Sequence, residues 1–312
     1  MMQGEEVQPV SGRRRSNASP QSDRQRQLVG AFLVVLSAAA IAVVPTLARL
    51  AYDGGSDTLT VITSRSIVTA GACFLVMAAL GRPLVIRGSA LRISLALGVL
   101  YAVHLYGLLG AVSYLPVNIV ILVFYLHPLM VGVIAILFGR ETMSWGRFAA
   151  LVAAIVGLGL AVGFSLGNLN WIGMGLALTA AVLAAVVIIG GSHAMKSSDS
   201  LTVTCYMMVS AAASLVVICV IHGDLRLPVT LQGWTGFSGV AIAYTIGTVT
   251  FFAAIPLLGA VRAAMISNLE PVLGILFAMA VLGEAVSPLQ ALGIALVIGS
   301  IFAIEARRRP VA

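Results

Sequence analysis

The chain has 312 residues, of which 60% are hydrophobic and only 9% are charged, and its formal net charge is +7. A water-soluble domain of this size has no use for so much apolar surface, so the composition indicates a multi-pass membrane protein that lives in a lipid bilayer. The positive charges lie at the two ends and between apolar runs, which excludes a nucleic-acid-binding surface as their explanation.

Residues 1–27 form the first clearly non-membranous segment, because they hold five arginines among Ser, Gln and Pro residues. This composition predicts a disordered cytoplasmic tail. The apolar run that follows is too long for a signal-peptide core and lacks a clear cleavage site, so we expect a retained helix. Residues 306–312, which include three consecutive arginines, are predicted to form a second basic cytoplasmic tail.

A window of about 20 residues, the length that crosses a bilayer as a helix, predicts ten transmembrane spans. Their approximate limits are 28–50, 57–80, 91–113, 116–138, 145–165, 171–192, 200–221, 233–256, 261–283 and 287–305. Ten spans place both termini on one side. Fifteen of the eighteen cationic residues then lie on that side, two lie on the other side, and Arg65 lies within a span. This asymmetry predicts an inner (plasma) membrane protein with both termini in the cytoplasm.

The sequence repeats itself with an offset of 142 or 143 residues. The segment Asp-x-Leu-Thr-Val at 57–61 returns at 199–203, and Pro128 and Glu141 return as Pro271 and Glu284. The two halves, 28–165 and 171–305, therefore each contain five spans. An odd number of spans inverts the second half relative to the first, so the sequence predicts an all-α protein built from two inverted five-helix repeats.

Small residues recur at every fourth position in the fifth and tenth predicted spans. The two stripes are Ala149, Ala153, Gly157 and Ala161, and Ala291, Ala295, Gly299 and Ala303. Such a stripe lets two helices approach closely, so we expect both to be packing faces. The alternative is that Ala and Gly are simply common in apolar helices.

Three prolines are predicted to break spans: Pro45, Pro128 and Pro271. A proline has no N–H, so Pro128 leaves the carbonyl of Phe124 unbonded and Pro271 leaves that of Ser267. Within a membrane, these carbonyl oxygens must accept hydrogen bonds from protein, water or substrate. Matching breaks in the two halves predict a transport site near the midplane, whereas Pro45 is interpreted as a kink alone.

Four ionisable side chains lie well inside predicted spans, on four different helices: Arg65, His104, His127 and Glu270. At 1.5 Å per residue, all four fall within about two turns of the midplane. Isolated ionisable groups at this depth are functional candidates by default, and their shared depth predicts one polar site.

Arg65 cannot be neutralised by burial, so we expect it to clamp a substrate carboxylate or phosphate; a structural pair with Glu270 or snorkelling is the alternative. Tyr101 precedes His104 by three residues and shares its helix face, so both are candidates for substrate binding, although His104 could equally be a core histidine bonded to a backbone carbonyl.

Three further residues are candidates for substrate binding: Asn268, which could also satisfy the broken backbone, Tyr206 and Tyr244. Tyr106 is expected to point away from the site, and Tyr125 and His127 are expected on different faces because they are two residues apart.

Glu270 and His127 are also candidates for proton coupling. Burial favours a neutral carboxyl group, whereas a nearby Arg65 or a protonated His127 favours a charged one. The sequence leaves open whether Glu270 exchanges protons or stays charged.

The segment Asn-Leu-Glu-Pro-Val at 268–272 and the Leu-Gly-Glu at 282–284, together with five-plus-five spans, resemble the EamA family of the drug/metabolite transporter superfamily. The first half carries a degenerate copy, Tyr-Leu-His-Pro at 125–128 and Gly-Arg-Glu at 139–141. The resemblance covers about 30–305 and implies ten helices, a central cavity and export or exchange of small polar metabolites such as amino acids. His127 stands where many repeats of the family have an acid.

We therefore expect a secondary transporter that exports or exchanges a small polar metabolite by alternating access, with proton coupling through Glu270 left open. No cofactor, metal or catalytic residue is predicted, because no hydrolase triad, HExxH helix, P-loop or Rossmann pattern occurs. The alternative is an intramembrane enzyme or a metal-binding membrane protein that uses His104, His127 and Glu270. A homodimer remains open.

Overall fold

The computed structural model describes residues 20–82, 85–115, 117–137, 145–162, 170–222, 225–282 and 287–306, and its regular elements within these ranges are all helices. In chain order they are α1 (Pro20–Ala42), α2 (Val44–Asp53), α3 (Thr58–Ala79), α4 (Ser89–Val112), α5 (Val117–Phe124), α6 (His127–Leu137), α7 (Trp145–Val162), α8 (Trp171–Ala194), α9 (Ser200–His222), α10 (Leu231–Leu258), α11 (Ala260–Ile266), α12 (Leu269–Leu282) and α13 (Pro288–Ala306).

The predicted terminal tails and repeated motifs lie only partly within the described ranges. Helix α1 begins at Pro20, within the predicted tail 1–27, because Gln and Arg continue a helix well beyond the apolar run. Residues 1–19 and 307–312, and the motif residues Glu141 and Glu284, lie outside the described residues.

Among the described residues, eight segments are long and apolar enough to cross a membrane by length and composition, and they coincide with eight of the ten predicted spans. The fifth and tenth predicted spans correspond to shorter apolar helices, Phe148–Ala161 and Pro288–Ser300. The ten-span count therefore stays a prediction, while a multi-pass membrane protein is confirmed.

Three of the spans are broken, each next to a predicted proline. Pro45 lies in the first turn of α2, Pro128 in the first turn of α6 and Pro271 in the first turn of α12. A first-turn N–H has no partner within its own helix, so a proline is tolerated there and begins the second half of each span. Pro45 is exposed, consistent with a kink alone.

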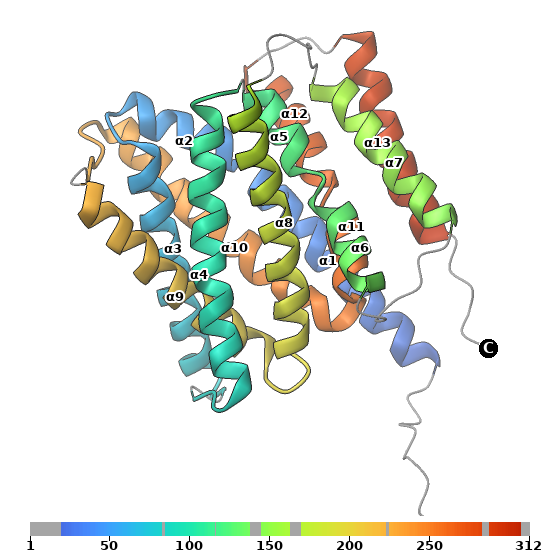
Figure 1. Ribbon diagram of the computed structural model, residues 1–312, viewed down its shortest axis with the longest axis horizontal. Helices are drawn as coiled ribbons and strands as arrows, with labels where there is room; N and C mark the ends of the chain where they lie inside the picture. Colours follow the sequence, from blue (N-terminus) through green and yellow to red (C-terminus); the bar gives the residue numbers. More distant parts are fainter. Residues whose placement is uncertain are drawn as a thin grey trace, which may run out of the picture.

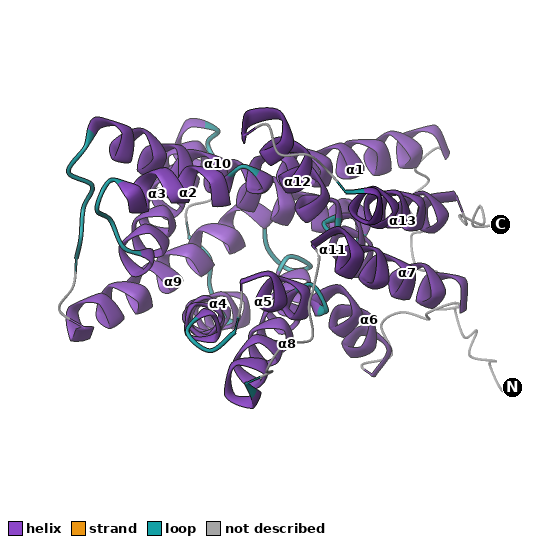
Figure 2. Cartoon of the chain, turned by 90° about the horizontal axis from the view of Figure 1, so that it is seen from above, coloured by secondary structure: helices purple, strands orange, loops and turns teal. Residues whose placement is uncertain are grey.

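The helices are arranged as two interleaved halves (Figure 1). Helices α3 and α9 pack together at one end of the molecule, and α7 and α13 pack together at the other (Figure 2). Between these pairs, α1 packs on α10 along one side and α8 packs on α4 along the other. Exchanging the two repeats turns the first of these contacts into the second, so the packing follows a pseudo-two-fold axis.

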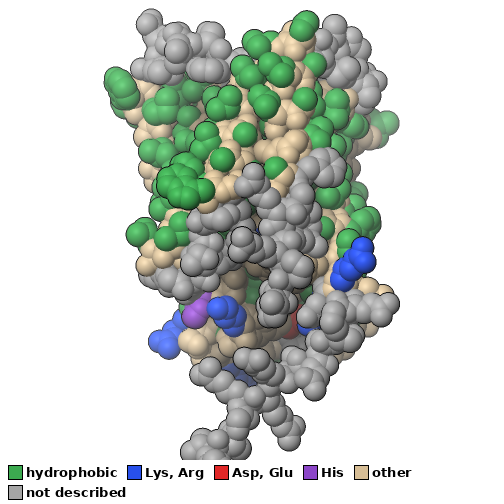
Figure 3. All heavy atoms as spheres, turned by 90° about the vertical axis from the view of Figure 1, so that its right-hand side faces the viewer, with side chains coloured by type: hydrophobic (Ala, Val, Ile, Leu, Met, Phe, Trp, Pro, Cys, Tyr) green, Lys and Arg blue, Asp and Glu red, His purple; other side chains and the backbone are tan. Residues whose placement is uncertain are grey.

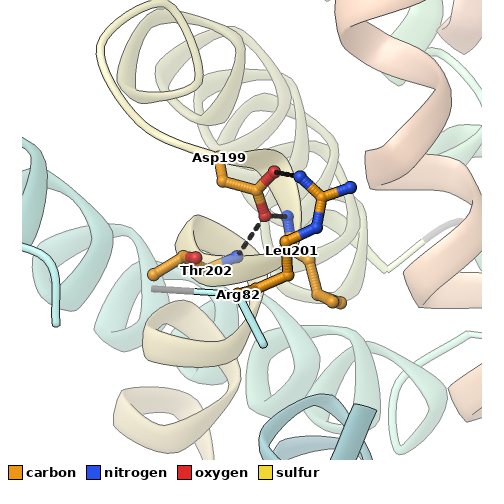
Figure 4. A network of polar contacts seen from close by, with 4 residues as sticks. All are labelled: Arg82, Asp199, Leu201 and Thr202. Atoms are coloured by element: carbon orange, nitrogen blue, oxygen red, sulfur yellow. Dashed lines mark hydrogen bonds and ion pairs between the residues drawn. The ribbon is translucent and has the colours of Figure 1, made fainter. Parts of the chain in front are cut away.

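The repeated Asp-x-Leu-Thr-Val segments begin α3 and α9 with equivalent caps. Asp57 accepts from the backbone N–H of Thr60 at 2.9 Å, and Asp199 accepts from those of Leu201 and Thr202 at 3.1 and 3.4 Å (Figure 4). Each carboxylate satisfies orphan donors at a helix start. Each carboxylate also contacts the other repeat. The guanidinium of Arg82 lies 3.5 Å from the Asp199 carboxylate, and the backbone N–H of Arg226 donates to the Asp57 carboxylate at 3.3 Å.

The outer surface is broadly apolar, as a bilayer requires. Side chains such as Phe32, Phe74, Leu137 and Trp171 are more than half exposed. On the face shown in Figure 3, hydrophobic side chains cover most of the height, whereas Lys and Arg side chains gather towards its lower end. This separation is what a membrane-embedded body with a basic, wet end would show.

Helices α7 and α13 approach each other through two glycines. A Cβ added at Gly157 would lie 2.8 Å from the carbonyl oxygen of Gly293, and one added at Gly293 would lie 2.4 Å from the backbone nitrogen of Ala161. The first small-residue stripe is thus a packing face around Gly157. The prediction of a packing face is wrong for most of the second stripe: a Cβ at Gly299 meets nothing within 4 Å, and Ala291 and Ala295 are exposed, while Ala303 packs against the core. Lipid accepts alanine as readily as a helix does, so the spacing alone did not identify the face.

We expect Gly293→Ala to destabilise the protein, because the added methyl group would collide with backbone atoms of α7. Overpacking of this kind costs about 1–3 kcal/mol. Gly299→Ala is the matched control: it adds the same methyl group on the same helix where space is open, and its higher helix propensity should leave stability unchanged or slightly raised. Thermal unfolding in detergent measures both. Equal melting temperatures for the two variants would contradict the close approach.

Candidate functional site

Polar and aromatic side chains from both repeats are joined in one network, which we call the central polar cluster. Ring contacts, hydrogen bonds and electrostatic interactions connect its members, which are Arg65, Tyr101, His104, Phe124, Tyr125, His127, Tyr244 and Glu270. They come from α3, α4, α5, the α5–α6 break, α6, α10 and α12. The structure thus brings together all four ionisable residues that the sequence places near the midplane.

Arg65 is held by an aromatic ring and not by an acid. Its Cζ atom lies 4.0 Å from the centroid of the Tyr244 ring, a cation–π contact, and the Tyr244 hydroxyl is hydrogen-bonded to the Tyr101 hydroxyl. The Nε of Arg65 is buried without a hydrogen-bond partner. No ion pair within 4 Å joins Arg65 to Glu270, both of which are described, so the predicted alternative of a direct structural pair is not formed, although their charges interact.

His104 and Tyr101 share a helix face, as their spacing predicts. Their ring centroids lie 4.8 Å apart, edge to face, and the other side of His104 stacks on Phe124 at 5.9 Å. His104 is buried. The backbone of Tyr101 interacts with the His104 ring, and the His104 Nδ1 atom has no hydrogen-bond partner. The backbone contact is what the core-histidine alternative expects, so that alternative and the substrate-binding prediction for His104 both stay predictions.

His127 repairs the break in its own span. Its Nδ1 lies 3.1 Å from the carbonyl oxygen of Phe124, which is the oxygen that Pro128 cannot bond. Because a carbonyl only accepts, Nδ1 carries the hydrogen. In the second repeat the oxygen freed by Pro271, that of Ser267, accepts instead from the backbone N–H of Glu270 at 2.9 Å. Both freed oxygens are satisfied by protein, one by a side chain and the other by the backbone.

Tyr125 belongs to the cluster, although sequence reasoning left it out. Its hydroxyl is hydrogen-bonded to the carboxyl group of Glu270, and its ring centroid lies 5.8 Å from that of His127. The expectation that Tyr125 and His127 point apart was wrong, because it assumed a continuous helix, whereas residues 125–126 form the break between α5 and α6. The repeat register was the missed signal, since Tyr125 is the counterpart of the candidate Asn268.

The remaining candidates lie in different settings. Asn268 is buried in the break between α11 and α12, and its Oδ1 has no hydrogen-bond partner. Tyr206 lies on α9, half-buried against the large apolar core. Within the described ranges, no three His, Cys, Asp or Glu side chains gather as metal ligands.

The comparisons with known proteins decide the family. A model of the EamA-like transporter family matches residues 28–163 and, a second time, residues 171–305. The chain belongs to the EamA-like transporter family. It is a transmembrane transporter protein of the drug/metabolite transporter superfamily, which confirms the resemblance seen in the sequence, and each match covers one of the two predicted repeats.

A solved structure described as "Crystal structure of protein" superposes on this EamA-like chain with a TM-score of 0.73. The alignment covers 89% of this chain and 97% of the other at 18% identity, which shows a shared fold. A search of curated proteins finds no match.

Proposed function

We propose that this EamA-like protein is a secondary transporter of the plasma membrane that exports or exchanges a small polar metabolite, an amino acid or a related compound. The observation that carries the proposal is the central polar cluster, which both repeats build beside their broken helices. Broken helices at matching positions of inverted repeats are where transporters bind their substrates, and alternating access moves the repeats around such a site.

The groups left unpaired in and beside the cluster favour a substrate with both a negative and a donating group. The Nε of Arg65 is a donor without an acceptor, and the Oδ1 of Asn268 is an acceptor without a donor. Leaving such groups buried costs about 1–3 kcal/mol each. A solute with a carboxylate for Arg65 and an amino group for Asn268 or Glu270 relieves both, which supports an amino acid or a similar compound.

Proton coupling is the second part of the proposal. Glu270 is the only carboxyl group in the central polar cluster, and its one hydrogen-bonding side-chain partner there is Tyr125. A carboxyl group that gains and loses a proton as the repeats move would link substrate export to proton entry, with His127 as a further proton-carrying group. We propose Glu270 as the coupling residue.

Metabolite profiling tests the function directly. Cells that overexpress the protein should accumulate at least one small polar metabolite in the medium, and cells that lack it should release less of the same compound. Overexpressed Arg65→Ala protein at the same membrane level is the matched control and should behave like the deletion. If profiles are identical in all three strains, export is the wrong function and a receptor without flux becomes the better explanation.

The predicted topology can be checked without a substrate. The beginning of α1 and the end of α13 lie towards the same end of the molecule (Figure 1). With the arginine asymmetry, this predicts that both termini face the cytoplasm. A C-terminal fusion to a reporter that is active only in the cytoplasm should therefore be fully active. Strong signal from a reporter that works only outside the cytoplasm would overturn the ten-span count.

A further inference from the structure

The two helix breaks present equivalent pairs of side chains, but only one pair is bonded. With the offset of 143, Tyr125 corresponds to Asn268 and His127 corresponds to Glu270. Tyr125 reaches across to the other repeat and bonds Glu270. The equivalent link, from Asn268 to His127, is not made: the Oδ1 of Asn268 is buried without a partner, and the Nδ1 of His127 is turned back to Phe124.

Alternating access offers an explanation for the fact that only one of the two equivalent pairs is bonded. In a transporter of inverted repeats, each repeat takes the other's conformation when the site opens to the opposite side. A contact between the repeats in one state is then replaced by the contact between the equivalent residues. We propose that Asn268 and His127 bond to each other in the second state, so that the two breaks carry alternating latches. The proposal rests on the alternating access proposed above.

The hydrogen-bonding groups fit this exchange without any change of proton count on the imidazole. In the second state, the backbone N–H of His127 would donate to the carbonyl oxygen of Phe124, as the backbone N–H of Glu270 donates to that of Ser267 in the structure. The Nδ1–H of His127 is thereby released. This N–H group is a hydrogen-bond donor, and the Oδ1 of Asn268 is an acceptor that has no donor in the structure.

Because asparagine is shorter than tyrosine, the second latch requires the two breaks to approach each other in addition to the exchange of conformations. For Asn268 to reach His127, the two breaks must lie closer together than they do while Tyr125 spans the gap. Helix α11, which leads into the second break, already packs against α6, which leaves the first. The change is therefore a local closing of an existing contact.

One contact in the central polar cluster should survive the exchange and supplies the control. Tyr101 and Tyr244 are 143 residues apart, so they are each other's counterparts, and their hydroxyl groups bond to each other. Exchanging the repeats maps this bond onto itself. It contributes equally to both states, so its loss should not move the balance between them.

The native cysteines report the balance without any substrate. Cys205 lies near the start of α9 and Cys219 near its end, and both are buried. Two variants are made, one that keeps only Cys205 and one that keeps only Cys219, with the remaining cysteines replaced by alanine. Each variant is purified in detergent and reacted with a water-soluble maleimide. The ratio of the two labelling rates measures which end of α9 opens.

Tyr125→Phe breaks the latch seen in the structure and should change this ratio by about three- to ten-fold, the effect of one hydrogen bond. Adding Asn268→Leu, which has the same number of side-chain heavy atoms and the same branching but no acceptor, should return most of that change. Tyr101→Phe should leave the ratio unchanged. Asn268→Ala replaces the leucine variant if the latter does not give a single symmetric elution peak.

An unchanged ratio in Tyr125→Phe overturns the alternating latches, and a change that Asn268→Leu does not reverse overturns the role of Asn268. An equal change in Tyr101→Phe also overturns them, because the effect would then be general loosening. Metabolite export with an unchanged ratio rejects the latches alone, whereas the expected ratios without any export reject the transport function alone.

Discussion

Arg65→Ala is expected to lower transport by about 10- to 100-fold at matched membrane levels, the effect of losing a charge-assisted hydrogen bond to the substrate. Arg65 carries a permanent charge among buried side chains, rests on the Tyr244 ring and has no carboxylate within ion-pair distance among the residues that the structure describes. Its charge is therefore available to an anionic group of the substrate. Flux of the exported metabolite in proteoliposomes measures the effect.

Arg65→Lys separates charge from geometry. Lysine keeps the positive charge but presents a single ammonium group instead of a planar fork, and it stacks less well on Tyr244. We expect an intermediate loss of about three- to ten-fold. Arg92→Ala is the matched control, because Arg92 is exposed in the first turn of α4 and should be replaceable without loss of flux. Equal flux in wild type, Arg65→Lys and Arg65→Ala would rule out a role in substrate binding.

The sequence predicts the features that depend on local chemistry. Prolines lack an N–H, so the breaks at Pro128 and Pro271 could be predicted, and the bilayer's penalty on charge allowed Arg65, His104, His127 and Glu270 to be assigned to one depth. Repeat boundaries followed from the offset between the halves, and the family model matches nearly the same residues, 28–163 and 171–305.

The features that the sequence did not predict depend on tertiary contacts. The partner of Arg65 is Tyr244, and nothing local to α3 predicts that α10 supplies it. Tyr125 was excluded by helical geometry that does not hold at the break it occupies. Gly299 was expected to pack and does not, because a small residue suits lipid and a neighbouring helix alike.

Glu270→Gln is expected to abolish accumulation driven by a pH difference and to leave exchange of substrate at equal pH largely intact. Glutamine keeps the size of the side chain and can still accept the hydrogen bond from Tyr125. It cannot ionise, so it can neither take up nor release a proton as the repeats move. Coupling is lost for this reason, while the positions of the other cluster residues are kept.

The test uses proteoliposomes loaded with the exported metabolite, first with a pH difference and no substrate gradient, and then at equal pH with labelled substrate on one side. Asp53, an exposed acid in the last turn of α2 that is no member of the central polar cluster, gives the control variant Asp53→Asn, and we expect it to retain pH-driven accumulation. If Glu270→Gln still concentrates substrate on a pH difference alone, the coupling role is wrong. If exchange at equal pH is lost together with accumulation, Glu270 contacts the substrate directly, because a group that carries only the proton is not needed when no proton gradient drives the cycle.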